Sequence, residues 1–275
     1  MSRNESKGGP TVSTCLLVAG TPDAVRLADA IVDRFGGGVR VELVFVGVAA
    51  MPSNRRVTVS GIGLPSEDSA LVAWTRTGDL VIDGLDPFDL PAIRRLTAAT
   101  EAAGCPRLPF RSRMWERHPL DRWVEVRDLA GAVKAIPSVA RIALLSLPRA
   151  QISAFEQVGG LRFPVRLPAA VPAPAWTLPP RFPQVLAPAP TSLARECHIL
   201  RETKAQAVVM RATGALDDGI LVAAARSFDL PVVMIRRPID RKDRAARSIT
   251  AALEWLEHAV KPGPRGSVSR ETDRV

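Results

Sequence analysis

The chain has 275 residues, of which 47% are hydrophobic and 24% are charged, and its formal net charge is +9. This length allows one or two domains with a proper core, and the ordinary apolar content excludes wholesale disorder. The three cysteines lie far apart with no CxxC pair, which excludes a disulfide scaffold or a cysteine zinc site and indicates a reducing compartment. The first residues, MSRNESKGGP, contain no apolar signal-peptide core, and no apolar run approaches the ~20 residues that span a bilayer. We therefore expect a cytoplasmic protein with no membrane partner.

The positive net charge indicates an anionic partner, and the distribution of the charge along the chain bears on whether this partner is a nucleic acid or a small molecule. Basic residues are spread along the chain, and the main cluster, residues 236–247, also contains two aspartates. Aromatic residues make up 5% and tyrosine is absent, so a platform for stacking nucleic-acid bases would be poorly supplied. A small ligand with several carboxylates or phosphates explains the charge equally well. We expect such a ligand rather than nucleic acid, and no metal site, since the three histidines lack metal-ligand spacing.

The first half of the chain alternates predicted strands and helices. An apolar run at residues 15–19 has the length of a buried strand, and a Gly-Thr-Pro-Asp turn follows it. Apolar residues then recur at helical spacing until three glycines at 36–38 end the helix. Further strands are predicted at residues 39–47, 78–86 and 105–110, and further helices at residues 67–75 and 91–103. This order of strand, turn, helix and strand is typical of a parallel α/β sheet.

The second half resumes the alternation after a charged stretch with two tryptophans at residues 111–126. A proline-rich stretch, residues 164–190, is irregular or edge-like. The rest of the pattern predicts helices at residues 128–134, 192–204 and 216–228, and strands at residues 143–147, 205–211 and 230–238.

These elements predict an α/β fold of two parallel-sheet domains with a ligand cleft between them. We place the first domain at residues 13–138 and the second at residues 139–260. The tails, residues 1–12 and 261–275, are polar and are expected to be disordered.

Ligands of an open parallel sheet bind beyond the carboxyl ends of its strands, so those loops hold the candidate residues. Gly20 and Thr21 follow the first strand, where a glycine lets the backbone approach a phosphate and the next helix offers free N–H groups. Gly61 and Gly63 provide a second glycine loop, which could form a backbone wall for a dinucleotide. Neither loop carries a full GxGxxG motif, so an ordinary turn is the alternative at each.

Three further loops carry charged or aromatic side chains. Asp83 or Asp86, after the third predicted strand, could handle a proton, although an acid at this position also serves as a helix cap. The stretch with Arg111, Arg113 and Trp115 suits a flat, polyanionic ligand, because guanidinium groups bind carboxylates in pairs and tryptophan stacks on planar rings. A solvated loop with tryptophan anchors is the alternative. Arg211 and Thr213, at the end of a strand in the second half, could hold an anionic edge of the ligand.

Taken in order, these segments resemble the precorrin-6A reductase family of cobalamin (corrin) biosynthesis, from about residue 16 to 238. AGTPDAVRLADAI is similar to the family's Gly-Gly-Thr-x-Glu-Ala and the helix after it, and DLVIDGLDPFDLPAI stands at its Asp-Ala-Thr-His-Pro-Phe-Ala. AAGCPRLPFRSRMW resembles the family's helix, short strand and Arg-x-x-Arg-Pro-x-Trp, and DRWVEV follows it. AQAVVMRATGA and AARSFDLPVVMIRRP resemble its Lys-x-Ser-Gly-Gly loop and closing Leu-Pro-Val segment.

The resemblance implies an oxidoreductase with a Rossmann-like first half. Such an enzyme transfers a hydride from NADPH to one double bond of the precorrin-6A, or cobalt-precorrin-6A, tetrapyrrole macrocycle. The loops above then divide between the two ligands. The cofactor is assigned to Gly20, Thr21, Gly61 and Gly63, and the macrocycle to Pro87, Phe88, Arg111, Arg113, Trp115, Arg211 and Thr213. For the proton that this reduction also requires, the candidates are Asp86 and solvent.

The chain departs from the family pattern at three functional positions. The family's Ala-Gly-Arg, suited to the extra phosphate of NADPH, is Val-Gly-Val-Ala at residues 46–49, so Arg55 or Arg56 would have to supply that charge. The family's Thr-His is Leu85-Asp86, and its Lys is Arg211. These departures leave an alternative open, in which the chain is a non-catalytic relative that binds a tetrapyrrole or nucleotide and retains the fold.

Overall fold

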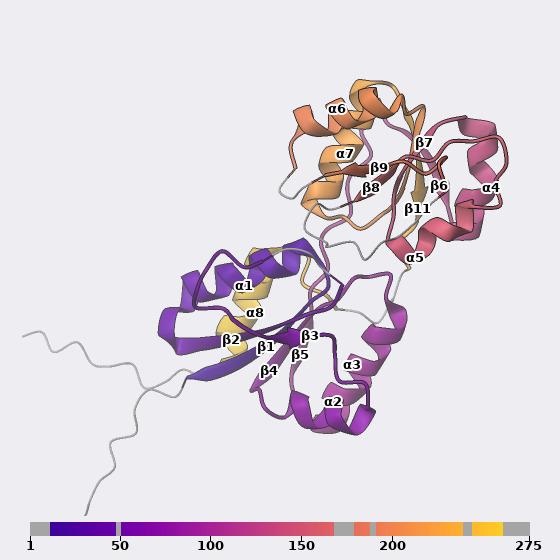
Figure 1. The fold of residues 1–275 in the computed structure, drawn as a ribbon. Coiled ribbons are helices and arrows are strands. Elements are labelled where there is room, and N and C mark those ends of the chain that lie inside the picture. Colours follow the sequence, from indigo (N-terminus) through magenta and orange to yellow (C-terminus); the bar gives the residue numbers. More distant parts are fainter. Residues whose placement is uncertain (1–11, 48–50, 168–178, 188–190, 239–243, 261–275) are drawn as a thin grey trace, which may run out of the picture.

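The computed structural model describes residues 12–47, 51–167, 179–187, 191–238 and 244–260, which form two α/β lobes (Figure 1). The first lobe is built on five parallel strands in the order β3-β2-β1-β4-β5. These strands are β1 (Ser13–Ala19), β2 (Val39–Phe45), β3 (Thr58–Ile62), β4 (Leu80–Gly84) and β5 (Arg107–Pro109). Its helices are α1 (Pro22–Phe35), α2 (Asp68–Thr75), α3 (Leu90–Ala103) and α8 (Ile249–Ala259).

The second lobe is built on six parallel strands in the order β6-β11-β10-β7-β8-β9. These strands are β6 (Arg122–Val126), β7 (Ala143–Ser146), β8 (Val165–Leu167), β9 (Gln184–Leu186), β10 (Ala207–Arg211) and β11 (Pro231–Ile235). Its helices are α4 (Leu129–Val139), the short α5 (Arg149–Ile152), α6 (Leu193–Thr203) and α7 (Leu216–Ser227). The predicted fold class, α/β with two parallel sheets, is confirmed.

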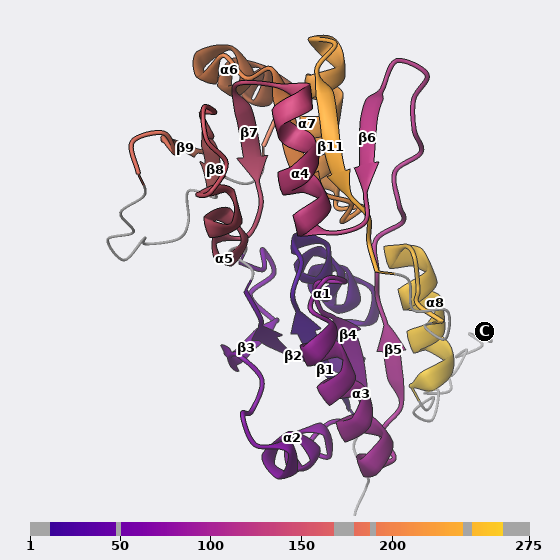
Figure 2. The same ribbon diagram turned by 90° about the vertical axis from the view of Figure 1, so that its right-hand side faces the viewer.

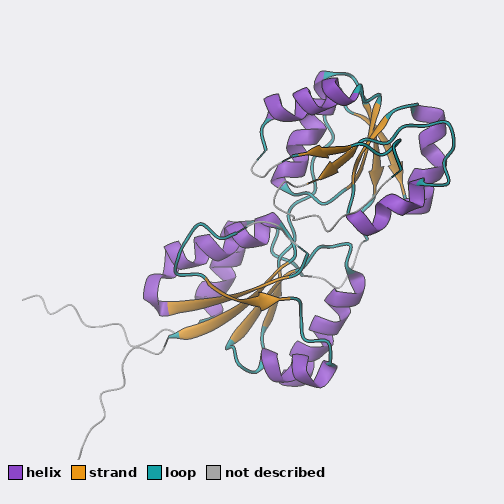
Figure 3. Ribbon diagram, viewed as in Figure 1, coloured by secondary structure: helices purple, strands orange, loops and turns teal. Residues whose placement is uncertain are grey.

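Helices cover both faces of each sheet (Figure 3), which explains the continuous apolar runs of the central strands. Alternate residues of β1 belong to different cores: Cys15 and Leu17 pack with α1 and α8, whereas Leu16 and Val18 pack with α2 and α3. In the second lobe, α4 and α5 pack on one face and α6 and α7 on the other. The central strands are therefore packed between apolar side chains, and polar functional residues are expected at the strand ends.

Helix α1 forms where the sequence predicts it, for local reasons. The Thr21 hydroxyl caps its first turn by accepting a hydrogen bond from the Ala24 N–H, and Pro22 occupies the first helical position, where no N–H is required. Gly36 ends the helix with a positive φ of 56°. These signals set the direction in which the amino end of α1 faces the second lobe.

The predicted division at residue 138 does not separate the two sheets, because the chain crosses between the lobes twice. Strand β6, which precedes this boundary, pairs with β11 of the second sheet. Helix α8, which follows the second sheet, packs in the core of the first lobe. The two crossing segments meet where Phe110 bridges Ala246, and the Arg111 N–H donates to the Ala246 carbonyl at 3.0 Å. Each lobe therefore contains chain from both halves of the sequence.

Five further elements differ from the sequence prediction. Strands β3 and β6 are exposed edge strands with polar or charged residues, which gives them no apolar run to detect. Strands β8 and β9 lie in the stretch predicted as irregular or edge-like, and β9 is the edge of its sheet. Helix α8 was missed although Ser248 caps it and Ala252 and Leu256 recur at helical spacing on its buried side. The predicted tails lie outside the described residues apart from Val12.

Within the described part of the chain, no helix is both long and apolar enough to cross a membrane. The same residues contain no group of three histidine, cysteine or acidic side chains that could hold a metal ion.

Candidate functional site

The carboxyl ends of the two sheets face each other at the junction of the lobes (Figure 2). Asp86 follows β4 in the first lobe, and Arg211 ends β10 in the second. Their side chains form an ion pair, with Arg211 Nη2 2.7 Å from Asp86 Oδ2. A second ion pair joins Arg26 of α1 to Asp217 of α7 at 3.0 Å. The ligand-binding ends of two parallel sheets thus converge on one place.

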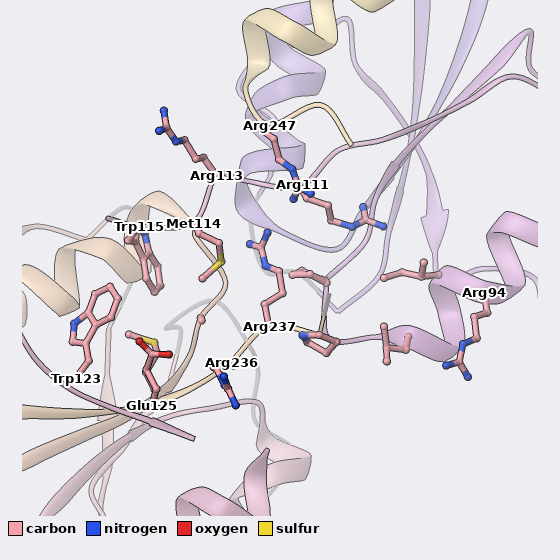
Figure 4. Close-up of a pocket in the computed structure, with 16 residues that line it drawn as sticks. Arg94, Arg111, Arg113, Met114, Trp115, Trp123, Glu125, Arg236, Arg237 and Arg247 are labelled. Carbon is pink, nitrogen blue, oxygen red and sulfur yellow. The ribbon is translucent and has the colours of Figure 1, made fainter. Parts of the chain in front are cut away.

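A cavity of about 810 Å³ lies at this junction (Figure 4). Its apolar wall comes from both lobes and consists of Pro87, Leu90, Ile93, Met114, Trp115, Trp123, Ala212, Met234 and Pro238. Its cationic residues are Arg94, Arg111, Arg113, Arg236, Arg237 and Arg247. Among the lining residues that the structure describes, Glu125 is the one carboxylate. A concave apolar space with a strong excess of guanidinium groups suits a large ligand that carries several negative charges.

Asp83, at the end of β4, anchors two of the arginines near this cavity. Its carboxylate is completely buried and lies 2.5 Å from Arg107 Nη1 and 2.9 Å from Arg111 Nη2. Arg111 also donates to the backbone carbonyl of Asp83. Arg111 is itself 4% exposed, so this guanidinium holds the buried carboxylate and lines the cavity only with its edge. The geometry indicates a structural role for the charge of Arg111, which the sequence assigned to the macrocycle.

Arg113 and Trp115 lie on the crossing segment after β5 and differ from Arg111 in exposure. The Arg113 side chain is 78% exposed and pairs with the exposed Glu116 at 2.8 Å. The Trp115 N–H donates to the Ala215 carbonyl at 3.2 Å, which fixes the ring against the start of α7. Arg113 is therefore the more available cation, and Trp115 is a rigid wall of the cavity.

The two sequence departures at Asp86 and Arg211 contact each other. Besides its ion pair, Asp86 accepts a hydrogen bond from the Phe88 N–H at 2.9 Å, and the Arg211 guanidinium lies 4.7 Å from the centroid of the Phe88 ring. Both carboxylate oxygens of Asp86 are thus engaged. Asp86 would have to give up one of these contacts in order to carry a proton to the ring, so the geometry favours a bridging role over the proton delivery expected from the sequence.

Arg237 joins the loops of the two lobes. Its guanidinium donates to the Ser112 carbonyl at 3.0 Å and to the Thr213 carbonyl. Burial, with the neighbouring Arg247 and Arg111, lowers the pKa of Arg237 to about 10, so it stays charged at neutral pH. Its Nε and the indole N–H of Trp123 are buried and have no hydrogen-bond partner within the described part of the chain. Two unsatisfied donors in the lining of one cavity indicate that a ligand with acceptor oxygens completes them.

Thr213 organises the turn after β10. Its hydroxyl donates to Asp218 Oδ2 at 2.6 Å and accepts from the Ala215 N–H at 3.2 Å. Burial raises the pKa of Asp218, against the lowering effect of the Thr213 hydrogen bond and the charges of Arg166 and Arg211. Both Thr213 bonds are internal to this turn, so Thr213 shapes the loop beside the cavity and is not among the lining residues.

Gly20 lies in a tight turn against β4. Its N–H donates to the Gly84 carbonyl at 2.9 Å, and a Cβ atom at Gly20 would overlap the backbone of Leu85 and Asp86. Nearby, Asp23 pairs with Arg26 and accepts from the Ser112 hydroxyl. Only glycine fits this approach of the first turn to the end of β4.

A second cavity, of about 670 Å³, connects the first loop with the crossing segment. Asp23 of α1 lines it together with Arg113 and Trp115, which also line the first cavity. The first turn of α1, through Asp23, and the segment that carries Arg113 therefore line one cavity, whereas Gly20 and Thr21 are not among the lining residues of either cavity.

The second predicted glycine loop is part of an edge strand. Gly61 lies within β3, and Gly63 follows it with a positive φ of 83° and an N–H that donates to the Phe45 carbonyl at 2.7 Å. Gly47, after β2, also has a positive φ, of 72°. Neither a Cβ at Gly47 nor one at Gly63 would meet a neighbouring atom. The ends of β2 and β3 therefore leave open space beside the backbone.

Arg55 and Arg56 lie at the wrong end of the sheet to contact a cofactor phosphate. Thr58 pairs with Glu42 in the middle of β2, so the two arginines precede β3 near the amino end of that strand. At about 3.3 Å per residue, they are on the order of 15–20 Å from the carboxyl end of β2. The Arg56 N–H bonds to the Asn54 side chain, which in turn bonds to Asp33 of α1. Neither arginine replaces the charge missing at residues 46–49.

The structure brings four of the residues predicted for the macrocycle, Pro87, Arg111, Arg113 and Trp115, into the wall of one cavity. Phe88, Arg211 and Thr213 lie beside it in the contact between the lobes. Trp123, the second tryptophan of the charged stretch singled out in the sequence, also lines this cavity, whereas sequence reasoning missed Glu125, Arg236, Arg237 and Arg247. A signal existed for Arg236 and Arg237, since they directly follow β11, whereas the others depend on the crossing of the chain between lobes.

Comparison with known proteins gives consistent relatives over most of the chain. The family model described as "Precorrin-6x reductase CbiJ/CobK" matches residues 14–257. The precorrin-6A reductase of Rhodobacter capsulatus is 30% identical over 255 residues, covering 90% of this chain and 97% of that protein. The precorrin-6A reductase of Rhodococcus erythropolis is 27% identical over 250 residues, covering 88% and 96%. A solved structure titled "CobK precorrin-6A reductase" superposes with a TM-score of 0.75 at 27% identity, covering 93% of this chain and 100% of that one.

Proposed function

The chain belongs to the precorrin-6x reductase CbiJ/CobK family, and we propose that it is an oxidoreductase that reduces one double bond of the precorrin-6A macrocycle in cobalamin biosynthesis, with NADPH as the hydride donor. The named relatives, matched over nearly their whole length, support this activity. The three free cysteines, Cys15, Cys105 and Cys197, favour a cytoplasmic location, which is part of the proposal.

The observation that carries the proposal is the composition of the cavity between the lobes. A tetrapyrrole with acetate and propionate arms is flat and apolar in its centre and anionic around its rim. The cavity offers tryptophan and methionine side chains for the ring, and four exposed arginines, Arg94, Arg113, Arg236 and Arg247, for the arms. The unsatisfied N–H groups of Trp123 and Arg237 would bond to oxygens of those arms.

The first lobe fits a dinucleotide at the carboxyl ends of β1, β2 and β3. Gly20, Gly47 and Gly63 each follow one of these strands, and the space beside Gly47 and Gly63 is open. The amino end of α1 follows Gly20 and Thr21 and directs the positive end of its dipole toward a pyrophosphate. Bound there, NADPH supplies the hydride and both electrons of the reduction.

The residues of this chain bind, orient and enclose the macrocycle. Exposed Arg113 would capture a carboxylate arm, while Trp115, held by the Ala215 carbonyl, would set the plane of the ring. The ion pair between Asp86 and Arg211 holds the two lobes together at the cleft. This closure limits water in the site and brings the ring toward the first lobe.

We expect only a modest preference for NADPH over NADH. Residues 46–53 after β2 read VGVAAMPS and contain no charged side chain, and Arg55 and Arg56 lie near the other end of β2. The ribose pocket therefore has neither an arginine for the extra phosphate from this loop nor a carboxylate that would repel it. Tryptophan fluorescence titrations with NADPH and NADH should give dissociation constants within about tenfold of each other.

The activity is tested by anaerobic incubation of the purified chain with precorrin-6A and NADPH. We expect loss of NADPH absorbance in a one-to-one ratio with formation of the dihydro product, identified by a mass increase of two hydrogens. Arg113→Ala should raise the KM for the macrocycle while the affinity for NADPH is unchanged. Arg34→Ala is the matched control, because Arg34 is also exposed, pairs with Glu257 and does not line the cavity. Tight macrocycle binding without turnover would instead identify a non-catalytic relative.

A further inference from the structure

Glu125 is unusual among the residues that line the cavity. It lies on β6, and Figure 4 shows its carboxylate pointing into the space near Trp115, Trp123 and Arg236. The other lining residues within the described ranges are apolar, aromatic or arginine side chains. A carboxylate in the wall of a site for a polyanion opposes binding as long as it is ionised. Its presence there calls for a chemical role.

Glu125 is also free, in contrast to the other carboxylates near the junction. Asp83 is held by Arg111, and Asp86 is held by Arg211. Asp218 accepts from the Thr213 hydroxyl. The exposed Glu125 carboxylate makes no hydrogen bond or ion pair with the residues that the structure describes, although arginines line the same cavity. It is the acid that can move and exchange a proton without breaking a structural contact.

Binding of a polyanionic ring changes which form of Glu125 is favoured. Arg113, Arg236 and Arg237 line the same cavity as Glu125, and Arg236 directly follows β11, the strand that pairs with β6. The arms of the macrocycle occupy those arginines, add negative charge and exclude water, and each of these effects favours the neutral acid. Macrocycle binding is therefore coupled to uptake of a proton at Glu125, next to the ring.

We propose that Glu125 is the general acid of the reduction, an inference that rests on the proposed function. One carbon of the double bond gains a hydride, which brings both electrons, and the adjacent carbon gains the proton of the Glu125 carboxyl group. The π bond is replaced by two C–H bonds, NADPH becomes NADP⁺, and Glu125 is left as a carboxylate. Solvent restores its proton after the product leaves. Asp86 is unsuited to this step because both of its oxygens are engaged.

The test compares Glu125→Gln with wild type in steady-state reduction of precorrin-6A by NADPH. We expect kcat to fall by about 100-fold, the lower end of what a general acid contributes. KM should stay equal or decrease, because the neutral amide no longer repels the carboxylate arms. Wild-type kcat should fall at high pH as the acid of the bound complex loses its proton, and this limb should disappear in Glu125→Gln. Glu125→Asp, which keeps an acid, should recover part of kcat.

Proton uptake gives a second readout that is independent of turnover. Calorimetric titration of precorrin-6A into the NADP⁺ complex, in two buffers of different ionisation enthalpy, should show about one proton taken up by wild type and none by Glu125→Gln. Glu202→Gln, an exposed acid of α6 that does not line the cavity, should match wild type in every assay.

The outcomes separate the inference from the proposed function. If wild type reduces precorrin-6A and Glu125→Gln does so with the same kcat and pH profile, solvent delivers the proton and the inference is rejected. An increase in KM with an unaltered kcat would mean that Glu125 only contacts the substrate, which also rejects it. If wild type neither binds nor reduces the macrocycle, the proposed function fails and the inference fails with it.

Discussion

Arg111 and Arg113 are two residues apart, and the structure predicts opposite consequences when each is replaced by alanine. Arg111→Ala leaves the fully buried Asp83 carboxylate with Arg107 as its remaining ion-pair partner among the residues that the structure describes. Breaking a buried, hydrogen-bonded pair by removing one member costs about 3–5 kcal/mol, because the other charge stays buried. Arg113→Ala removes a pair whose side chains are 78% and 82% exposed, and such pairs are worth about 0–1 kcal/mol.

The measurement is the free energy of unfolding from urea denaturation, followed by tryptophan fluorescence. We expect a loss of at least about 3 kcal/mol for Arg111→Ala and less than about 1 kcal/mol for Arg113→Ala. Macrocycle affinity, measured on variants that fold, should show the opposite order: Arg113→Ala should weaken binding more than Arg111→Ala does. A double variant, Asp83→Asn with Arg111→Ala, should lose clearly less than the sum of the two single losses, by about 0.5–3 kcal/mol.

Two results would refute this reasoning. Equal destabilisation by the two alanine variants would mean that burial of the Asp83 pair does not decide the cost. Strict additivity in the double variant would mean that Arg111 acts on something other than Asp83.

Three further predictions concern groups around the junction. Asp86→Asn and Arg211→Gln should each lower kcat/KM for precorrin-6A. Because both changes remove the same ion pair, the double variant should lose less than the sum of the two single losses. Additive losses would contradict a bridge between the lobes. Burial raises the pKa of Asp218, so the folded protein binds a proton more readily there than the unfolded chain, and stability at this group falls as pH rises above the ordinary aspartate range. Asp218→Asn, which can still accept from Thr213, should therefore unfold at an equal or higher urea concentration than wild type at pH 7, and a lower midpoint would count against this sign. Burial raises the pKa of the Cys15 thiol, and burial together with the charge of Asp79 raises that of Cys105. Cys15, which is fully buried, should therefore react with a thiol reagent at pH 8 only after the protein unfolds. Modification of Cys15 in the folded protein would contradict its position in β1.

Much of the fold is predictable because its signals are local. The central strands are continuous apolar runs, since both faces of each sheet are covered, and α1 carries its own cap, proline and terminal glycine. The edge strands β3 and β6 lack such runs because one side of each is solvent, so their pairing depends on the neighbouring strand. For the same reason the domain boundary was placed incorrectly, since nothing in the sequence of β6 indicates that it pairs with β11, more than 100 residues away.

The sequence by itself determined the residue types at the strand ends, and so the chemistry of the site: glycines after β1 and β3, and arginine with tryptophan after β5. Only the tertiary structure decided which of these groups are available. Arg111 and Arg113 have the same charge and nearly the same position, but one is buried against Asp83 and the other faces solvent. Glu125 reaches the cavity only because the chain crosses between lobes and adds β6 to the second sheet. The physical reason is that local preferences act over a few residues, whereas burial, pairing and exposure of a charge are set by segments distant in the chain.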